Sequence, residues 1–454
     1  MPQNTFAPHT RQGAGTAGAL ALAIAVALAV PVTARASAFQ LKENSAQAMG
    51  RAYAGGGAAP HDVSVVVNNP AAMAWFKRSY LQVDATAIDF SANFHGSATD
   101  ALGQPISGGN GGNAGGTIPV PAFFYLHPIN DQWAVGMGVS APFGFKTSYD
   151  PTWVGRYSAV FSQFKTVDAT FSVSYRLNDQ FSLGASAILQ RTSADLSSAV
   201  NFGTILASPP FNLAPTFMPQ SADGLAEITG HNYKWGWQVG ATWKPTPQDT
   251  FGLLYHAKIA QTLHGTAFFS IPASVQTVFA GAQLPLFQNT PGSAAFTTPA
   301  YVNLSYWHQF NDRFSLGAEV DWTQWSVFKN LTINYANPAQ PSSTEVFNWK
   351  NSHFISVGGD YHLSHALTLR AGVGYDTTPT SLATRDPRVP DANRTWLSLG
   401  LGYRPVADFT INVGYAHLFV SNASIHSESP TLDLVTGYYT NSANLLAASA
   451  TYRF

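Results

Sequence analysis

Residues 308–323 read HQFNDRFSLGAEVDWT, and this stretch decides the fold. A run of alternating apolar and polar residues ends at Phe310, and the polar turn Asn311-Asp312 follows it. A new alternating run begins at Phe314. Apolar and polar side chains alternate in the new run, with Phe314, Leu316, Ala318, Val320 and Trp322 on one face and Ser315, Gly317, Glu319, Asp321 and Thr323 on the other. Period-two alternation predicts a β-strand. A strand with one apolar and one charged face is typical of a barrel between lipid and an aqueous lumen.

The same turn pattern recurs along the chain, at residues 126–133 and 175–181, with looser copies at 243–251, 361–367 and 403–409. Asn and Asp favour tight turns because their side chains bond the local backbone. Long connections rich in Gly, Pro and Ser lie near residues 95–117, 143–160, 194–230, 265–298, 327–347, 377–393 and 421–440. Six short turns alternating with seven long loops predict an all-β fold, a transmembrane antiparallel β-barrel of about 14 strands. The alternative, a soluble β-sandwich, would not place repeated Asp, Glu and Arg on its inner face.

The two ends of the chain favour export to the cell outer membrane. Arg11 precedes an apolar run over residues 17–30, and small residues follow it, so residues 1–36 are predicted to be a signal peptide cleaved after Ala36 or Ala38. A membrane anchor, the alternative, needs roughly 20 apolar residues. The last run ends on the aromatic residue Phe454, which resembles the insertion signal of outer-membrane barrels.

Composition agrees with a membrane protein. Charged residues make up 10% of the 454 residues, whereas soluble domains usually contain roughly 25%. The net charge is −1, so the chain has no excess of positive charge that would attract nucleic acid. The chain has no cysteine and must be stable without disulfides.

Residues 37–78 are predicted to form a hatch inside the barrel, which spans residues 79–454. A barrel of this size is too wide for its own side chains to fill. A disordered tail is the alternative, but the segment is too apolar to remain in water, as shown by Val63, Val65, Val66, Val67, Met73, Trp75 and Phe76.

Two further features point to a hydrophobic ligand. The two longest loops carry apolar side chains where polar ones are expected, and we predict ligand capture by Phe211, Phe217, Phe268 and Phe279. Alternatively, these loops only pack together as a lid. The motif Pro142-Phe143-Gly144 interrupts the strand that starts at Trp133, which predicts a kink and an opening in the wall.

Three groups of motifs resemble the FadL family of outer-membrane channels for long-chain fatty acids and aromatic hydrocarbons. They are residues 39–55 with Asn69-Pro70-Ala71, residues 141–144 with 153–157, and the block from Asp376 to Trp396. The resemblance implies a gating hatch that includes Gly50, Arg51 and Asn69-Pro70-Ala71. It also implies a hydrophobic groove at the outer loops, an inner pocket, and lateral exit beside a kinked third strand.

The substrate stays open between fatty acid and hydrocarbon. Arg191 and Lys329 are the nearest basic side chains that could meet a ligand carboxylate. They do not clearly align with the basic residues that the family places there, and either could equally be an ordinary charged residue at the base of a loop. Rival functions are a general porin or adhesin-like barrel and an outer-membrane lipolytic enzyme, for which Glu319 and Asp321 could supply acid–base groups. No Ser/His motif supports an enzyme, and the scattered histidines predict neither metal nor cofactor. We expect a non-enzymatic, passive, monomeric channel whose partners are a hydrophobic small molecule, outer-membrane lipid and lipopolysaccharide.

Overall fold

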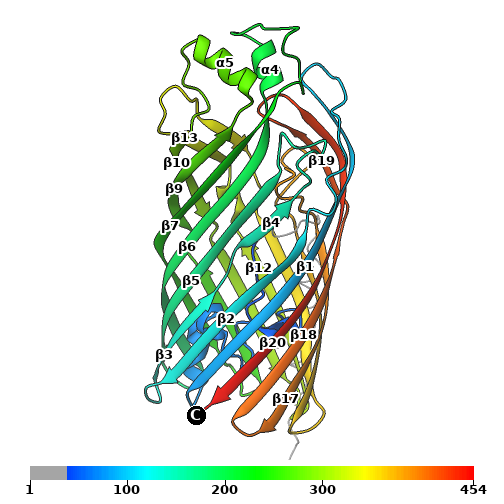
Figure 1. Cartoon of the computed structure of the whole chain (residues 1–454). Coiled ribbons are helices and arrows are strands. Elements are labelled where there is room, and N and C mark those ends of the chain that lie inside the picture. Colours follow the sequence, from blue (N-terminus) through cyan, green and yellow to red (C-terminus); the bar gives the residue numbers. More distant parts are fainter. Residues whose placement is uncertain (1–37) are drawn as a thin grey trace, which may run out of the picture. The chain divides into compact units, whose positions relative to one another are not determined.

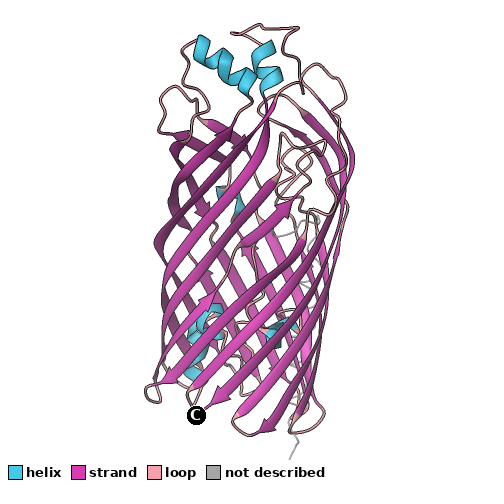
Figure 2. Cartoon of the chain, viewed as in Figure 1, coloured by secondary structure: helices cyan, strands magenta, loops and turns pink. Residues whose placement is uncertain are grey.

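The computed structural model describes residues 38–454, which form a β-barrel with short helices inside it and at one end (Figures 1 and 2). The predicted signal peptide, residues 1–36, lies outside the described residues. The strand segments are β1 (Tyr80–Thr99), β2 (Gly116–Pro128), β3 (Trp133–Ser140), β4 (Gly144–Ser148), β5 (Phe161–Arg176), β6 (Phe181–Asn201), β7 (Asp223–Trp243), β8 (Asp249–His256), β9 (Ile259–Ser270), β10 (Thr290–Thr298), β11 (Tyr301–Gln309), β12 (Phe314–Thr323), β13 (Asn330–Tyr335), β14 (Ser343–Val346), β15 (Ser352–His362), β16 (Leu367–Asp376), β17 (Arg394–Val406), β18 (Phe409–Val420), β19 (Ala423–Glu428) and β20 (Leu434–Arg453).

In six places, two consecutive segments are the two halves of one interrupted strand, so the 20 segments form 14 wall strands. The pairs are β3/β4, β8/β9, β10/β11, β12/β13, β14/β15 and β18/β19. Neighbouring strands pair antiparallel around the wall, and β1 pairs with β20 from Tyr80–Arg453 to Thr99–Leu434. The predicted closed barrel of about 14 strands is confirmed.

The short turns have the chemistry expected from the sequence. The Asn311 side-chain oxygen accepts hydrogen bonds from the backbone N–H groups of Arg313, at 2.9 Å, and Phe314, at 3.0 Å. Asn130 and Asn178 make the same pair of bonds in their turns. The asparagine therefore caps each of these three turns and starts the following strand.

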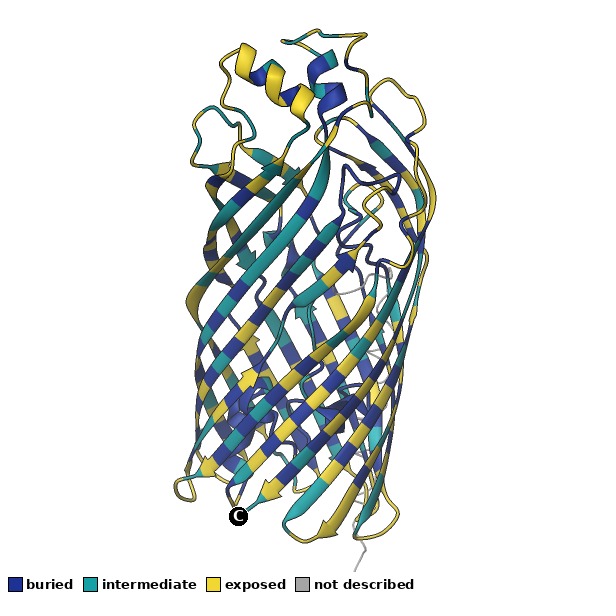
Figure 3. Cartoon of the chain, in the orientation of Figure 1, coloured by how far each residue is buried: buried dark blue, intermediate teal, exposed yellow. Residues whose placement is uncertain are grey.

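Burial alternates along the wall strands (Figure 3). On β12 the inward side chains of Glu319 and Asp321 are buried, whereas Val320, which points to the outer face, is 41% exposed. Apolar side chains on the outer face can be exposed here because they meet lipid rather than water.

The two longest loops are shorter than the sequence predicted. β6 and β7 stay paired through to Asn201 and Asp223, inside the predicted loop 194–230. β9 continues to Ser270 and β10 starts at Thr290, inside the predicted loop 265–298. The outer ends of these strands contain Gly, Ser and Thr, residues that are common in loops. Helices α4 (Phe202–Ala207) and α5 (Ala273–Gly281) occupy the remaining loops at the outer end.

The N-terminal segment lies inside the barrel at the end opposite α4 and α5 (Figure 1). It contains α2 (Ala46–Met49), α3 (Val65–Asn68) and the 3-10 helix η1 (Pro70–Trp75). Glycines at the contact between this segment and the wall let the two backbones approach each other closely. A Cβ atom added at Gly50 of the segment would lie 2.8 Å from the Cα atom of Gly400 on the wall strand β17. Over residues 38–454, no helix is both long and apolar enough to span a bilayer.

Candidate functional site

The wall is interrupted between β2 and the third wall strand. β3 pairs with β2 only from Pro128–Ala134 to Phe123–Val139, and β4 pairs with β5. Residues 116–122 of β2 pair with β1 on their other side. Within the described part of the chain, no ladder joins these residues to β4, so two strand edges face each other without hydrogen bonds. We call this place the lateral opening. The predicted break Pro142-Phe143-Gly144 lies between β3 and β4, at its margin.

Two prolines mark the β2 edge, and sequence reasoning missed them. Pro119 and Pro121 lie opposite Ala87 and Ala85 of β1. Alternate residues of a strand direct their backbone groups to the same edge, and proline has no N–H to donate there. The pattern Thr117-Ile118-Pro119-Val120-Pro121 was therefore a readable signal for an unpaired edge.

Residues 38–43, which we call the strap, cross the inner side of the opening. The Gly144 N–H donates to the Phe39 carbonyl oxygen at 2.9 Å, and the Leu41 N–H donates to the Pro142 carbonyl oxygen at 2.8 Å. The Ala38 N–H donates to the Asp391 carboxylate at 3.1 Å. The strap thus replaces, from within, part of the missing wall pairing.

An aromatic cluster holds the strap in place. The Phe39 ring centroid lies 4.6 Å from that of Trp325, 5.1 Å from that of Phe145 and 5.2 Å from that of Phe164. Phe143, at the predicted break, is fully buried in the same cluster. Phe143 thus packs in the lumen against the strap, while its carbonyl oxygen accepts from the Thr166 N–H at 2.9 Å.

An apolar cavity of about 350 Å³ lies at the opening. Its lumenal lining includes Phe39, Leu41 and Leu445, and its lining also includes Lys165 and Val167, which are exposed on the outer face of β5. Because side chains from both faces of the wall border one cavity, the cavity leads from the lumen through the wall towards the lipid.

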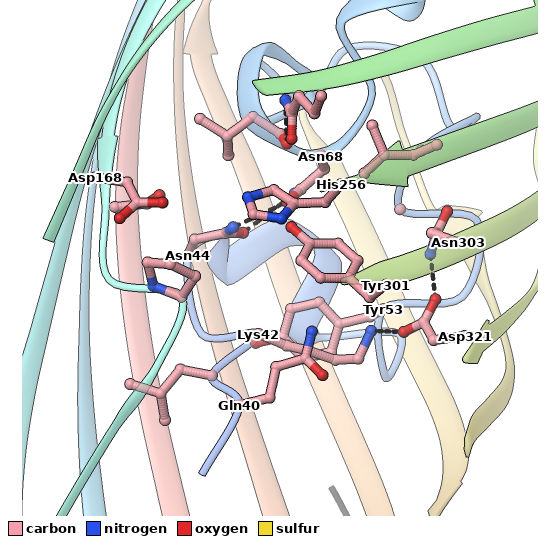
Figure 4. Close-up of a pocket in the computed structure, with 18 of the residues that line it drawn as sticks. Gln40, Lys42, Asn44, Tyr53, Asn68, Asp168, His256, Tyr301, Asn303 and Asp321 are labelled. Carbon is pink, nitrogen blue, oxygen red and sulfur yellow. Dashed lines mark hydrogen bonds and ion pairs between the residues drawn. The ribbon is translucent and has the colours of Figure 1, made fainter. Parts of the chain in front are cut away.

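A second, polar pocket of about 70 Å³ lies on the other side of the strap (Figure 4). Lys42 forms ion pairs with Glu319, at 3.2 Å, and with Asp321. Burial lowers the pKa of Lys42, but the two carboxylates outweigh burial and raise it. Asp168 and His256 border the same pocket (Figure 4). The strap therefore separates a polar lumen from an apolar cavity. The ion pairs of Lys42 with Glu319 and Asp321 hold the end of the strap against β12.

The predicted hatch residues fix the N-terminal segment to the wall. Asn69 caps η1 by accepting from the Ala71 N–H at 3.2 Å, and its amide donates to the carbonyl oxygens of Gly57, at 3.0 Å, and Ala241, at 3.2 Å. Pro70 is the first residue of η1.

Arg51 is fully buried in the N-terminal segment. Its guanidinium nitrogens lie 3.9 Å from the Asp62 carboxylate and 3.7 Å from that of Asp360 on β15. The guanidinium also lies 5.0 Å from the centre of the Trp307 ring. A buried charge with partners on both hatch and wall is costly to displace.

Three of the four predicted capture residues come together at the outer end. Phe211, Phe217 and Phe279 belong to one apolar cluster, with the Phe211 and Phe279 ring centroids 5.7 Å apart. A groove of about 420 Å³ borders this cluster at Phe279 and Phe287. Phe268 does not join it: this side chain is 44% exposed on the outer face of β9.

Neither basic residue predicted to meet a carboxylate reaches a cavity described above. Arg191 lies on β6 with its guanidinium 5.9 Å from the centre of the Tyr233 ring, and Tyr233 is exposed on the outer face. Lys329 is exposed after the 3-10 helix η2 (Trp325–Val327). The cations that line the apolar cavity are instead Lys146, Lys165, Arg388 and Arg394. No cluster of metal ligands occurs among residues 38–454.

Comparisons with known proteins agree with this architecture. Residues 27–454 match the family model described as "Outer membrane protein transport protein (OMPP1/FadL/TodX)". The chain is 28% identical to outer membrane protein P1 of Haemophilus influenzae, covering 92% of this chain and 95% of that protein. It is 27% identical to the long-chain fatty acid transport protein of Escherichia coli O157:H7, covering 86% of this chain and 89% of that protein.

Solved structures show the same fold. A FadL homologue of Pseudomonas aeruginosa matches with a TM-score of 0.87 and 34% identity, covering 92% of this chain and 100% of that one. The toluene transporter TodX of Pseudomonas putida matches with a TM-score of 0.68 and 18% identity, covering 91% and 99%, which supports the fold alone. The family model, the relatives and the closed barrel agree, so this outer-membrane β-barrel belongs to the OMPP1/FadL/TodX family of transport proteins.

Proposed function

We propose that this protein takes up hydrophobic compounds passively and releases them sideways into the outer membrane. The observation that carries the proposal is the apolar cavity, which is bordered by both faces of the wall where β2 and β4 are unpaired. The family's relatives include proteins named for fatty-acid transport and for toluene transport, so both ligand classes are consistent with this route.

The proposed route has three stages. The ligand first binds in the groove beside Phe279 and Phe287 at the outer end, then passes to the apolar cavity beside the strap, and leaves through the lateral opening. Each CH₂ group that moves from water into lipid gains roughly 0.8 kcal/mol. Transfer into the membrane is therefore downhill without an energy source.

The hatch has the complementary role of closing the lumen. Gly50, Arg51 and the Asn69-Pro70-Ala71 turn hold it against β7, β15 and β17, and we assign gating to these contacts. A general porin would need an open lumen, so the enclosed hatch disfavours that alternative. Inward Glu319 and Asp321, which would be the acid–base pair of an enzyme, are instead bound to Lys42. We therefore propose a non-enzymatic channel, and a single closed barrel has no structural need for a partner subunit.

Closing the opening tests the proposed route. Residues 141–144 are replaced with alternating Val and Thr, and Pro119 and Pro121 are changed to Thr and Val, so that β2 and β4 can pair. Uptake of hydrophobic compounds should stop, whereas binding of a hydrophobic probe at the outer groove should persist. The matched control changes residues 171–174 of β5, which already pair on both sides, to alternating Val and Thr. Normal uptake by a variant whose restored pairing is confirmed by structure would refute lateral exit.

A further inference from the structure

Two lysines lie on the outer face of the wall at the margin of the lateral opening. Lys146 is on β4 and Lys165 is on β5, and both side chains are exposed, whereas their neighbours Thr147 and Phe164 are buried on the lumenal side. Lys165 lies opposite Gly144, so no side chain on β4 separates it from the opening. Lys146 lies opposite Gln163, two residues from Lys165 along the same face. Such diagonal neighbours are roughly 7–8 Å apart at their Cα atoms.

Among the described residues, the two lysines differ from the other cations of the cavity in having no acidic partner in an ion pair. Arg388 pairs with Glu345 at 3.4 Å, and Arg394 pairs with Asp376 at 3.0 Å. Within residues 38–454, neither Lys146 nor Lys165 forms an ion pair, and Lys146 only lies 5.8 Å from the centre of the Phe161 ring. Two like charges side by side are unfavourable on a strand face. Their placement beside an apolar cavity therefore leaves a positive charge available to a ligand.

The height of the lysines in the membrane fits the head group of an amphipathic molecule. Below Lys165 the outer face of β5 carries Val167, Ala169, Phe171, Val173 and Tyr175. Tyr175 packs on Trp133 at the short-turn end, with ring centroids 4.6 Å apart. Ten residues of strand, at roughly 3.3 Å each and a tilt of roughly 40°, place Lys165 about 25 Å above Tyr175, which equals the usual height of the apolar band. Lys165 thus lies at the outer boundary of that band.

We propose that Lys146 and Lys165 bind the carboxylate of the transported ligand while its tail occupies the apolar cavity, so that this channel prefers long-chain monocarboxylic acids to uncharged hydrocarbons. The proposal rests on the lateral route described above. The opposite margin carries Pro119 and Pro121, which offer no charge. The tail can therefore slide out past the prolines while the head stays on the lysine side at head-group level. A lipid phosphate is the other anion that could meet these lysines.

The test uses the full protein in liposomes of phosphatidylcholine, with and without added lipopolysaccharide. The transfer rates of oleate and of its uncharged match, methyl oleate, are compared. In both membranes the double variant Lys146→Gln/Lys165→Gln should move oleate about tenfold more slowly, which corresponds to about 1.4 kcal/mol, and should move methyl oleate at the wild-type rate. The double variant Lys146→Arg/Lys165→Arg should restore oleate transfer. Lys258→Gln, which changes an exposed lysine between β8 and β9, should affect neither compound.

The outcomes separate the possible readings. Equal slowing of both compounds, or no slowing of either, would overturn the carboxylate site while leaving lateral transport in place. An effect that appears only with lipopolysaccharide would also overturn it, because the lysines would then act through lipid phosphates. If wild-type protein accelerates neither oleate nor methyl oleate, the proposed uptake function itself fails.

Discussion

Replacing Gly372 with alanine should loosen the hatch and raise the conductance of the barrel. A Cβ atom at this position would lie 2.2 Å from the Arg51 carbonyl oxygen and 2.3 Å from the Arg51 carbonyl carbon. Both are backbone atoms, so no flexible side chain can move aside. Restoring ordinary contact requires the hatch backbone to shift by roughly 1 Å in a close-packed interior. Overpacking of this kind costs about 1–3 kcal/mol.

That free energy should raise the population of displaced hatch by a factor of about 5–150. Single-channel recordings in planar bilayers measure the change as more frequent openings. Gly116→Ala is the matched control, because a Cβ atom on this strand glycine would meet no atom within 4 Å. Gly358→Ala, whose Cβ atom would lie 2.3 Å from the same Arg51 oxygen, should reproduce the effect. Wild-type conductance in folded Gly372→Ala protein would refute the tight fit between hatch and wall.

Three further predictions concern the hatch and the outer loops. Deleting residues 39–76 should raise conductance from near zero to porin-like values, and unchanged conductance would show that these residues do not close the lumen. Changing Phe211, Phe217 and Phe279 together to Ser should weaken hydrophobic-probe binding, since each buried aromatic contributes about 1.5–3 kcal/mol in transfer terms. Phe268→Ser is the control and should bind normally; equal loss in both would contradict the capture site. Arg51→Ala removes the ion-pair partner of buried Asp62, while Asp360 keeps Arg370 at 3.2 Å. The change should destabilise the hatch by about 3–5 kcal/mol, measured as faster proteolysis of the N-terminal segment, whereas wild-type resistance would mean that the Arg51 ion pairs contribute little.

The barrel was predictable because its signals are local. Alternation along β12 and the asparagine turn at Asn311 each depend on residues adjacent in sequence, and the structure confirms both. The outward position of Arg191 was also within reach. Along β6, Leu183 and Leu189 lie on the outer face, and period-two alternation places Arg191, two residues after Leu189, on that face too.

The strap across the opening and the arrangement of the capture site depend on relations that sequence alone does not carry. The bond between Ala38 and Asp391 joins residues 353 positions apart. Phe268 and Phe269 are neighbours, and only the true extent of β9 decides that Phe268 faces outward while Phe269 packs 5.4 Å from Phe287. A loop has no alternating faces, so the predicted loop over residues 265–298 does not distinguish the two side chains.

The pairing of β1 with β20 constrains the order of assembly. Its register joins Tyr80 to Arg453, so the seam of the barrel forms between the segments at opposite ends of the described strand order. Until β20 arrives, β1 keeps an open edge that can pair with another chain. The hatch contacts strands on both sides of the lumen, including β7 and β15. It must therefore enter before or during closure of the seam, and a chain interrupted within β20 should accumulate as an open, aggregation-prone sheet.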